Sequence, residues 1–161
     1  MTKTFLSLLM VASIAVPLQA QTAPAKLIFP GHRFSIAPLE EISATSSYVV
    51  LFMNLPPTEN FSPNVNVMVQ QYQGTLEDFK ILSETQFVEQ KWVLIRSEVR
   101  EGKALVLEYA GAYNGVDMHW YSRVLKRGGQ VFLVTCTARE SQWGKLSPRL
   151  VGAVDSFTLE K

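Results

Sequence analysis

Three turn signals separate four β-forming segments in the second half of the chain, between residues 92 and 139. The turns are Glu101-Gly102, Asn114-Gly115 and Gly128-Gly129. Such pairs accept the positive φ angles of two-residue turns, so between apolar runs they are typical of β-hairpins. Each hairpin makes consecutive strands antiparallel. The segment is therefore predicted to form a four-stranded antiparallel meander.

A helix is predicted before the meander, from Thr75 to about Gln90. Thr75 suits the N-cap position, and Asp78 stands three residues later, as in a capping box. Apolar residues recur at the spacing of one helix face. This predicted stripe consists of Leu76, Phe79, Leu82 and Phe87.

A second helix is predicted after the meander, from about Ser141 to Val154. A break is expected at Pro148, because proline is tolerated in a first helical turn and Ser147 could cap a new turn there. Its apolar face is predicted from the same spacing. This face carries Trp143, Leu146, Leu150, Val151 and Val154. A last short strand is expected over residues 156–159.

Three strands are predicted upstream of the first helix. The segment 33–37 reads as a short strand, and 48–53 is a continuous apolar run that fits a strand buried on both faces. Residues 64–72 alternate between apolar and polar, as in a half-buried strand. Together the elements predict an α+β fold, in which a long antiparallel meander is flanked by two helices.

The first twenty residues have the order of a signal peptide. Lys3 supplies the positive charge, an apolar run follows, and Ala20 offers a cleavage position. We therefore expect a signal peptide over 1–20, a flexible segment over 21–32 and one domain over 33–161. The apolar run is too short to span a membrane. The mature protein is expected to be soluble and periplasmic or extracellular.

The net charge argues against one class of partner, and the cysteine count excludes an intramolecular disulfide. The chain has 15 basic and 14 acidic residues, and removing Lys3 with the signal leaves 14 of each. A net charge of zero argues against nucleic acid as a partner. The only cysteine is Cys136, so no intramolecular disulfide can form.

The two-residue turns also predict which residues face each other, because pairing proceeds outward from each turn. Glu108 is predicted opposite Tyr121, Tyr121 opposite Cys136, and Ile95 opposite Glu108. One face of the sheet then carries a polar cluster, namely Glu108, His119, Tyr121, Arg123 and Cys136. The opposite face is predicted to be core under a helix, and it carries Leu105, Leu107, Tyr109, Trp120, Val124 and Leu133.

The polar cluster permits one chemical hypothesis. His119 lies diagonal to Cys136 and could activate its thiolate as a nucleophile, with Glu108 orienting the site. Tyr121 and Arg123 are the candidate binding residues, and Arg123 is expected to pair with Glu108 across strands. The structural alternative is a buried cysteine in a strand beside ordinary cross-strand pairs. No metal-binding spacing, catalytic motif or cofactor signature is found, so no metal and no cofactor are expected.

Four short segments resemble the PsbP/DcrB-like family, which shares the fold of the Ran-binding protein Mog. They are Phe34–Pro38, Asn64–Val69 followed by a helix, Gly129–Ala138, and the closing Val154–Phe157. The resemblance spans most of the chain after the signal. It implies a three-layer α/β/α arrangement, no enzymatic activity and a role in binding other proteins.

These observations lead to one hypothesis and two alternatives. The favoured function is a non-catalytic exported binding or accessory protein of the cell envelope, acting through an exposed sheet face or the loop from Pro56 to Pro63. One alternative is a thiol-dependent enzyme using Cys136. The other is a small-ligand carrier, whose pocket between sheet and helix would be lined by Trp92, Tyr109, Trp120 and Trp143.

Overall fold

The structure is a computed structural model, and it describes residues 27–29, 33–36 and 47–160. The predicted signal peptide lies outside these residues, so it stays a prediction. The chain divides into two compact units, Met1–Leu39 and Glu40–Lys161. Each unit is described by itself.

The first unit contains a two-stranded antiparallel hairpin formed by β1 (Leu27–Phe29) and β2 (Phe34–Ile36). The predicted strand 33–37 is therefore present in a shorter form. The segment 21–32 was expected to be flexible, yet it includes β1. The three consecutive apolar residues of β1 pair with Phe34, Ser35 and Ile36 of β2.

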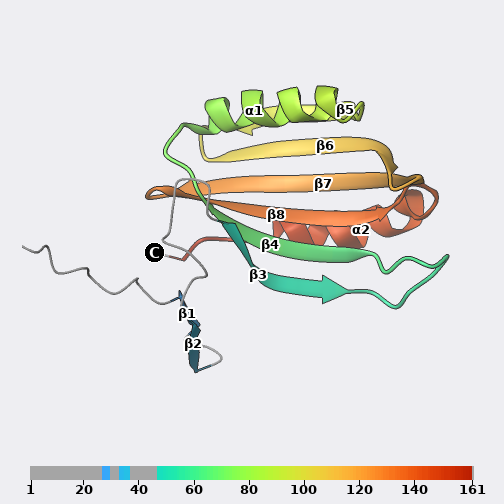
Figure 1. Cartoon of the computed structure of the whole chain (residues 1–161), viewed down its shortest axis with the longest axis horizontal. Coiled ribbons are helices and arrows are strands. Elements are labelled where there is room, and N and C mark those ends of the chain that lie inside the picture. Colours follow the sequence, from blue (N-terminus) through green and yellow to red (C-terminus); the bar gives the residue numbers. More distant parts are fainter. Residues whose placement is uncertain (1–26, 30–32, 37–46, 161) are drawn as a thin grey trace, which may run out of the picture. The chain divides into compact units, whose positions relative to one another are not determined.

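The second unit is a six-stranded antiparallel sheet with the order β3-β4-β8-β7-β6-β5 (Figure 1). Its strands are β3 (Ser47–Asn54), β4 (Asn64–Gln71), β5 (Val93–Arg100), β6 (Ala104–Tyr113), β7 (Val116–Arg127) and β8 (Gln130–Arg139). Its helices are α1 (Leu76–Glu89) and α2 (Glu140–Asp155). The meander runs from β5 to β8, and β4 joins it by pairing with β8.

Two separate hydrophobic cores lie on opposite faces of this sheet. Adjacent residues of β6, such as Leu105 and Val106, belong to different cores. Phe79 of α1 packs in the core with Leu105, whereas Leu150 of α2 packs in the core with Val106. The sheet is thus sandwiched between two helices, and the predicted α+β fold is confirmed (Figure 1).

The register of the meander agrees with the prediction at two of the three turns. Tyr113 pairs with Val116, and Arg127 pairs with Gln130. The first turn differs, because Arg100 pairs with Ala104 and leaves a three-residue loop. A bulge at Ile95 shifts the register again. The predicted pair of Ile95 with Glu108 is wrong, and Arg96 stands opposite Glu108 instead.

Strand β3 is an edge strand, so the prediction that residues 48–53 are buried on both faces is wrong. A continuous apolar run fits a central strand and an edge strand equally well in sequence. Burial depends on which strands pair beside it, which a sequence pattern does not contain. Strand β4 alternates as predicted, with Val65, Val67 and Val69 buried.

Helix α1 begins with the predicted capping box. The Asp78 backbone N–H donates to the Thr75 hydroxyl, and the Thr75 N–H donates to the Asp78 carboxylate. The Thr75 hydroxyl also donates to the Asp78 carboxylate, and the two bonds that this carboxylate accepts from Thr75 lower its pKa. Leu76, Phe79 and Phe87 are buried as expected, whereas Leu82 is exposed. Ser83 is buried instead of Leu82, so the buried face of α1 includes one polar residue.

Helix α2 is continuous through Pro148, so the predicted break is wrong. An internal proline costs a helix about 3 kcal/mol. Leu150 and Val154 lie beyond it and are almost fully buried, and their packing favours continuation of the helix. Residues 157–160 are irregular and form no strand, although Phe157 packs against the α2 core.

Within residues 27–29, 33–36 and 47–160, the structure contains no helix long and apolar enough to cross a membrane.

Candidate functional site

The polar cluster on the α2 face is organised around His119 on β7. The ring nitrogen Nδ1 lies 2.9 Å from Glu140 Oε2 on α2, and Nε2 lies 3.2 Å from Glu108 Oε1 on β6. The His119 side chain is only 5% exposed. Arg96 on β5 extends the chain of charges, at 3.6 Å from Glu108. We call these four residues the His119 network.

The two ring nitrogens of His119 connect two layers of the fold. A neutral imidazole carries one N–H donor and one lone pair, so the role of each nitrogen depends on the tautomer. Each nitrogen contacts one carboxylate, that of Glu108 on strand β6 or that of Glu140 on helix α2.

Trp143 covers the His119 ring. The two ring centroids are 3.9 Å apart and the planes differ by 13°, so the rings are stacked. Glu140 and Trp143 both belong to the first turn of α2, one on the ring edge and one on its face. The His119 network therefore attaches the N-terminal end of α2 to the sheet.

A second group attaches the C-terminal end of α2. The Tyr121 hydroxyl donates to Asp155 Oδ1 at 2.9 Å. The Arg123 guanidinium donates to the backbone carbonyls of Asp155 at 2.8 Å and Phe157 at 3.2 Å. Burial, together with the bond to Asp155, raises the pKa of Tyr121 to about 12. We call Tyr121, Arg123 and Asp155 the Asp155 network.

The prediction of an ion pair between Glu108 and Arg123 is wrong. The carboxylate of Glu108 contacts His119 and Arg96, and Arg123 turns to the end of α2. The sequence pattern did not place Glu140, Trp143 or Asp155 beside this cluster, because a helix contributes them. Strand pairing rules predict neighbours within a sheet, and they contain no term for the helix that covers it.

Cys136 lies between Tyr121 and Val65 in the sheet and is completely buried. Burial raises the pKa of its thiol to about 12, and the nearby charges of Asp155 and Glu108 act in the same direction. A nucleophilic cysteine needs the opposite shift and solvent access. The two ring nitrogens of His119 contact the carboxylates of Glu140 and Glu108.

The four aromatic residues assigned to a ligand pocket do not lie together. Trp92, Tyr109 and Trp120 form a stack beneath α1, with centroid separations of 4.7 Å to 5.6 Å. Phe87 of α1 closes the stack at 4.1 Å from Tyr109. Trp143 belongs to the opposite face. The stack is filled core, and the predicted common pocket is wrong.

An apolar hollow lies elsewhere, between the β3–β4 end of the sheet and α2. It has a volume of about 260 Å³. Its lining combines the two ends of a loop with one face of the helix, and includes Met53, Leu55, Pro63, Val65, Leu150 and Ala153. The connecting loop is the segment from Pro56 to Pro63 singled out in the sequence.

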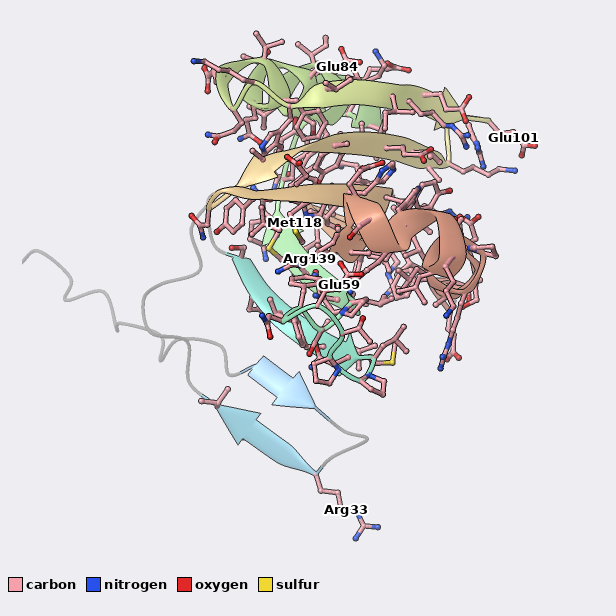
Figure 2. The ribbon with its side chains drawn as sticks, turned by 90° about the vertical axis from the view of Figure 1, so that its right-hand side faces the viewer. Arg33, Glu59, Glu84, Glu101, Met118 and Arg139 are labelled. Carbon is pink, nitrogen blue, oxygen red and sulfur yellow. The ribbon has the colours of Figure 1, made fainter. Side chains whose placement is uncertain are left out.

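Hydrogen bonds attach this loop to the start of α2. Gln142 Nε2 donates to the carbonyl and hydroxyl oxygens of Thr58 at 2.9 Å and 2.7 Å. The Ser141 hydroxyl donates to Glu59 at 2.7 Å. Figure 2 shows Glu59 at the end of the sheet where Arg139 also lies. The loop is thus tied to the helix that borders the hollow.

The described residues form no group of three or more histidine, cysteine, aspartate or glutamate side chains placed to hold a metal ion.

No protein-family model and no curated protein matches the sequence. Among solved structures, a Pseudomonas aeruginosa protein of unknown function, PA94, matches with a TM-score of 0.59 at 13% identity, over 85% of this chain and 97% of that protein. Cyanobacterial PsbP from Synechocystis sp. PCC 6803 matches with a TM-score of 0.49 at 14% identity, covering 79% of this chain and 98% of that chain.

LpqN of Mycobacterium tuberculosis, a protein involved in cell envelope biogenesis, matches with a TM-score of 0.40 at 14% identity, over 71% of this chain and 84% of that chain. The likeness to PA94 shows the fold alone at this identity. The PsbP-like sandwich of a sheet between two helices is therefore confirmed.

Proposed function

We propose that this chain is an exported, non-catalytic accessory protein that binds another protein of the cell envelope. The binding site is the apolar hollow between the loop from Pro56 to Pro63 and helix α2. The single observation that carries this proposal is a hollow with an apolar lining next to a loop held in place by hydrogen bonds.

The polar side chains support a non-catalytic role because their hydrogen bonds are internal. His119 binds Glu108 within the sheet and Glu140 on α2. Tyr121 and Arg123 bind the end of α2, and Cys136 is buried with a raised thiol pKa. In this fold these contacts join α2 to the sheet.

The dimensions of the hollow favour a side chain of a partner protein over a free small molecule. Small-molecule sites measure roughly 300–1,000 Å³. A hollow of about 260 Å³ falls below this range, and it is open to solvent. One or two apolar side chains on a partner surface would fill it, and its rigid border would reduce the entropy lost on binding.

Arg149 stands on the rim of the hollow and supplies a charged contact at its edge. Interfaces commonly combine an apolar centre with a polar rim. The rim side chain would fix the orientation of the partner, whereas Leu55 and Leu150 would provide apolar contact area. This division of roles defines the variants that test the proposal.

The test is site-specific photo-crosslinking from position 55 in the chain as its own host exports it. The expected result is a single crosslinked envelope protein. Ala153→Glu places a charge in the hollow and should reduce the crosslinked product at least about tenfold, equivalent to 1.4 kcal/mol. Gly152→Glu is the matched control. Gly152 is exposed on the same helix, an added Cβ there meets no atom within 4 Å, and it should leave the product unchanged.

Three results would contradict the proposed function. Equal loss in both variants would assign the effect to charge on α2 and not to the hollow. A bound mass of a few hundred daltons in native mass spectrometry, displaced by Ala153→Glu, would favour the small-ligand carrier. A turnover activity lost in Cys136→Ala would favour the thiol-dependent enzyme.

A further inference from the structure

Strand β3 exposes an uncharged apolar edge. Its eight residues, Ser47–Asn54, include no charged side chain. Five consecutive apolar residues in it are between 39% and 57% exposed, and these are Val49, Val50, Leu51, Phe52 and Met53. Among the described residues, β3 pairs only with β4, so its outer backbone groups face no strand.

The other edge of the same sheet is built differently. Strand β5 also exposes apolar side chains, but Arg96, Glu98 and Arg100 alternate along its second half. Charged side chains on an edge strand oppose pairing with a further strand, because pairing would desolvate them. Both edges contain one bulge, at Val50 and at Ile95. The difference between the edges is therefore the charge, which β5 has and β3 lacks.

We propose that β3 pairs antiparallel with β3 of a second copy of this chain, so that two six-stranded sheets become one continuous sheet. This inference is independent of the proposed partner in the hollow. A two-fold axis brings the same strand from each copy together. The two outer edges of the combined sheet are then both β5, whose charges prevent further addition. The assembly closes at two copies.

The absence of charged side chains on β3 makes pairing with its own copy free of like-charge repulsion. Like charges placed opposite each other across strands are destabilising, and a self-pairing strand always meets its own sequence. Strand β3 avoids this penalty because it has no charge to repeat. Its apolar side chains occupy both faces, so each one meets another apolar side chain. Main-chain hydrogen bonds would supply the rest of the affinity.

The first experiment measures the mass of the exported chain by sedimentation equilibrium over a range of concentrations. A reversible dimer is expected. Leu51→Lys should weaken dimerisation at least about tenfold, since two lysines would meet near the axis. Leu94→Lys is the matched control on β5, because Leu94 and Leu51 are 40% and 43% exposed and each adjoins a bulge. It should change the dissociation constant less than about twofold.

The second experiment tests the strand pairing directly. A two-fold axis normal to the sheet sets one residue of β3 directly opposite its own copy, and we place Leu51, near the centre of the strand, at that position. Opposed Cα atoms in antiparallel strands are about 4.5–5.5 Å apart, within reach of a disulfide. In a Cys136→Ser background, Leu51→Cys should form a covalent dimer under mild oxidation. Ile95→Cys should not.

Three outcomes would overturn the dimer. The first is a monomer at every concentration, with no disulfide crosslink at position 51. The second is a monomer in which the β3 amides that point away from β4 are protected from hydrogen exchange. This protection would show that another segment of the chain covers the edge. The third is a dimer weakened by Leu94→Lys and not by Leu51→Lys. Ala153→Glu should remove the crosslink from position 55 without weakening the dimer. The two proposals can therefore fail separately.

Discussion

At the scale of the residue, His119 shows how one buried side chain can join two layers of a fold. Both of its ring nitrogens meet carboxylates, one from β6 and one from α2, and Trp143 stacks on its face. A buried charged group without its partner is strongly destabilising. The stability that the His119 network provides therefore depends on the presence of all four of its residues.

We expect His119→Ala to reduce the free energy of unfolding by about 3 kcal/mol, because it leaves the largely buried Glu108 with Arg96 alone and removes the stack on Trp143. Glu140→Gln is the control. The Glu140 side chain is 52% exposed, so its change should cost less than about 1 kcal/mol. Urea unfolding measures both. A larger loss in Glu140→Gln than in His119→Ala would contradict this account of the network.

Cys136 gives a second prediction at the residue scale. Its buried thiol should resist a disulfide reagent in the folded protein and react only on unfolding, whereas a cysteine at Ile81, which is 60% exposed, should react at once. Rapid stoichiometric labelling of Cys136 in the native chain would disprove its burial. Ellman's reagent at pH 8 provides the measurement.

The raised thiol pKa also predicts a dependence of stability on pH. The folded thiol has a pKa of about 12, and an unfolded thiol has one of about 8.5. The stabilisation is complete below pH 8.5 and decreases as the pH rises from there towards 12, because the unfolded chain ionises first. Comparison of the wild type with Cys136→Ala isolates this slope from other titrations.

At the scale of the element, two glycines should respond in opposite ways to the same substitution. Gly111 lies in β6 against the Trp92 ring, and an added Cβ would overlap that ring. Gly144 lies in α2, and an added Cβ there meets no atom within 4 Å. Gly111 has no Cβ, which leaves room for the Trp92 ring of the aromatic stack. Gly144 has no such neighbour.

Gly111→Ala is expected to destabilise the protein by about 1–3 kcal/mol through overpacking. Gly144→Ala is expected to stabilise it by about 0.5–1 kcal/mol, because alanine loses less backbone entropy in a helix. Thermal or urea unfolding of the two variants tests the pair. The same sign for both would show that the stack adapts to the added methyl group.

At the scale of the whole molecule, one sheet serves both cores. Neighbouring residues of β6 and β7 point alternately into the α1 core and the α2 core. Separation of either helix would expose one face of the strands that support the other helix. Residues 47–160 should therefore unfold as one cooperative unit.

Tryptophan fluorescence can test this cooperativity because the tryptophans report from opposite faces. Trp143→Phe leaves Trp92 and Trp120 under α1, and the double change Trp92→Phe with Trp120→Phe leaves Trp143 under α2. Within each variant, the fluorescence midpoint should coincide with the midpoint from far-UV circular dichroism. Separate midpoints would mean that one layer opens before the other.

The sequence alone determined the features that depend on neighbours along the chain. The Asn114-Gly115 and Gly128-Gly129 turns predicted the register of three strands, and with it the pairs of Tyr121 with Glu108 and Cys136. The capping box at Thr75 predicted the start of α1. These signals are local, since turn geometry and helix caps are set by the residues that form them.

Tertiary structure decided the features that depend on distant residues. The edge position of β3, the continuity of α2 through Pro148 and the partners of Glu108 all follow from what packs beside these elements. The hollow beside α2 likewise arises from segments about ninety residues apart. Burial and side-chain contact are properties of three-dimensional packing, and a hydrophobic pattern records only that a residue can be buried, not which neighbour buries it.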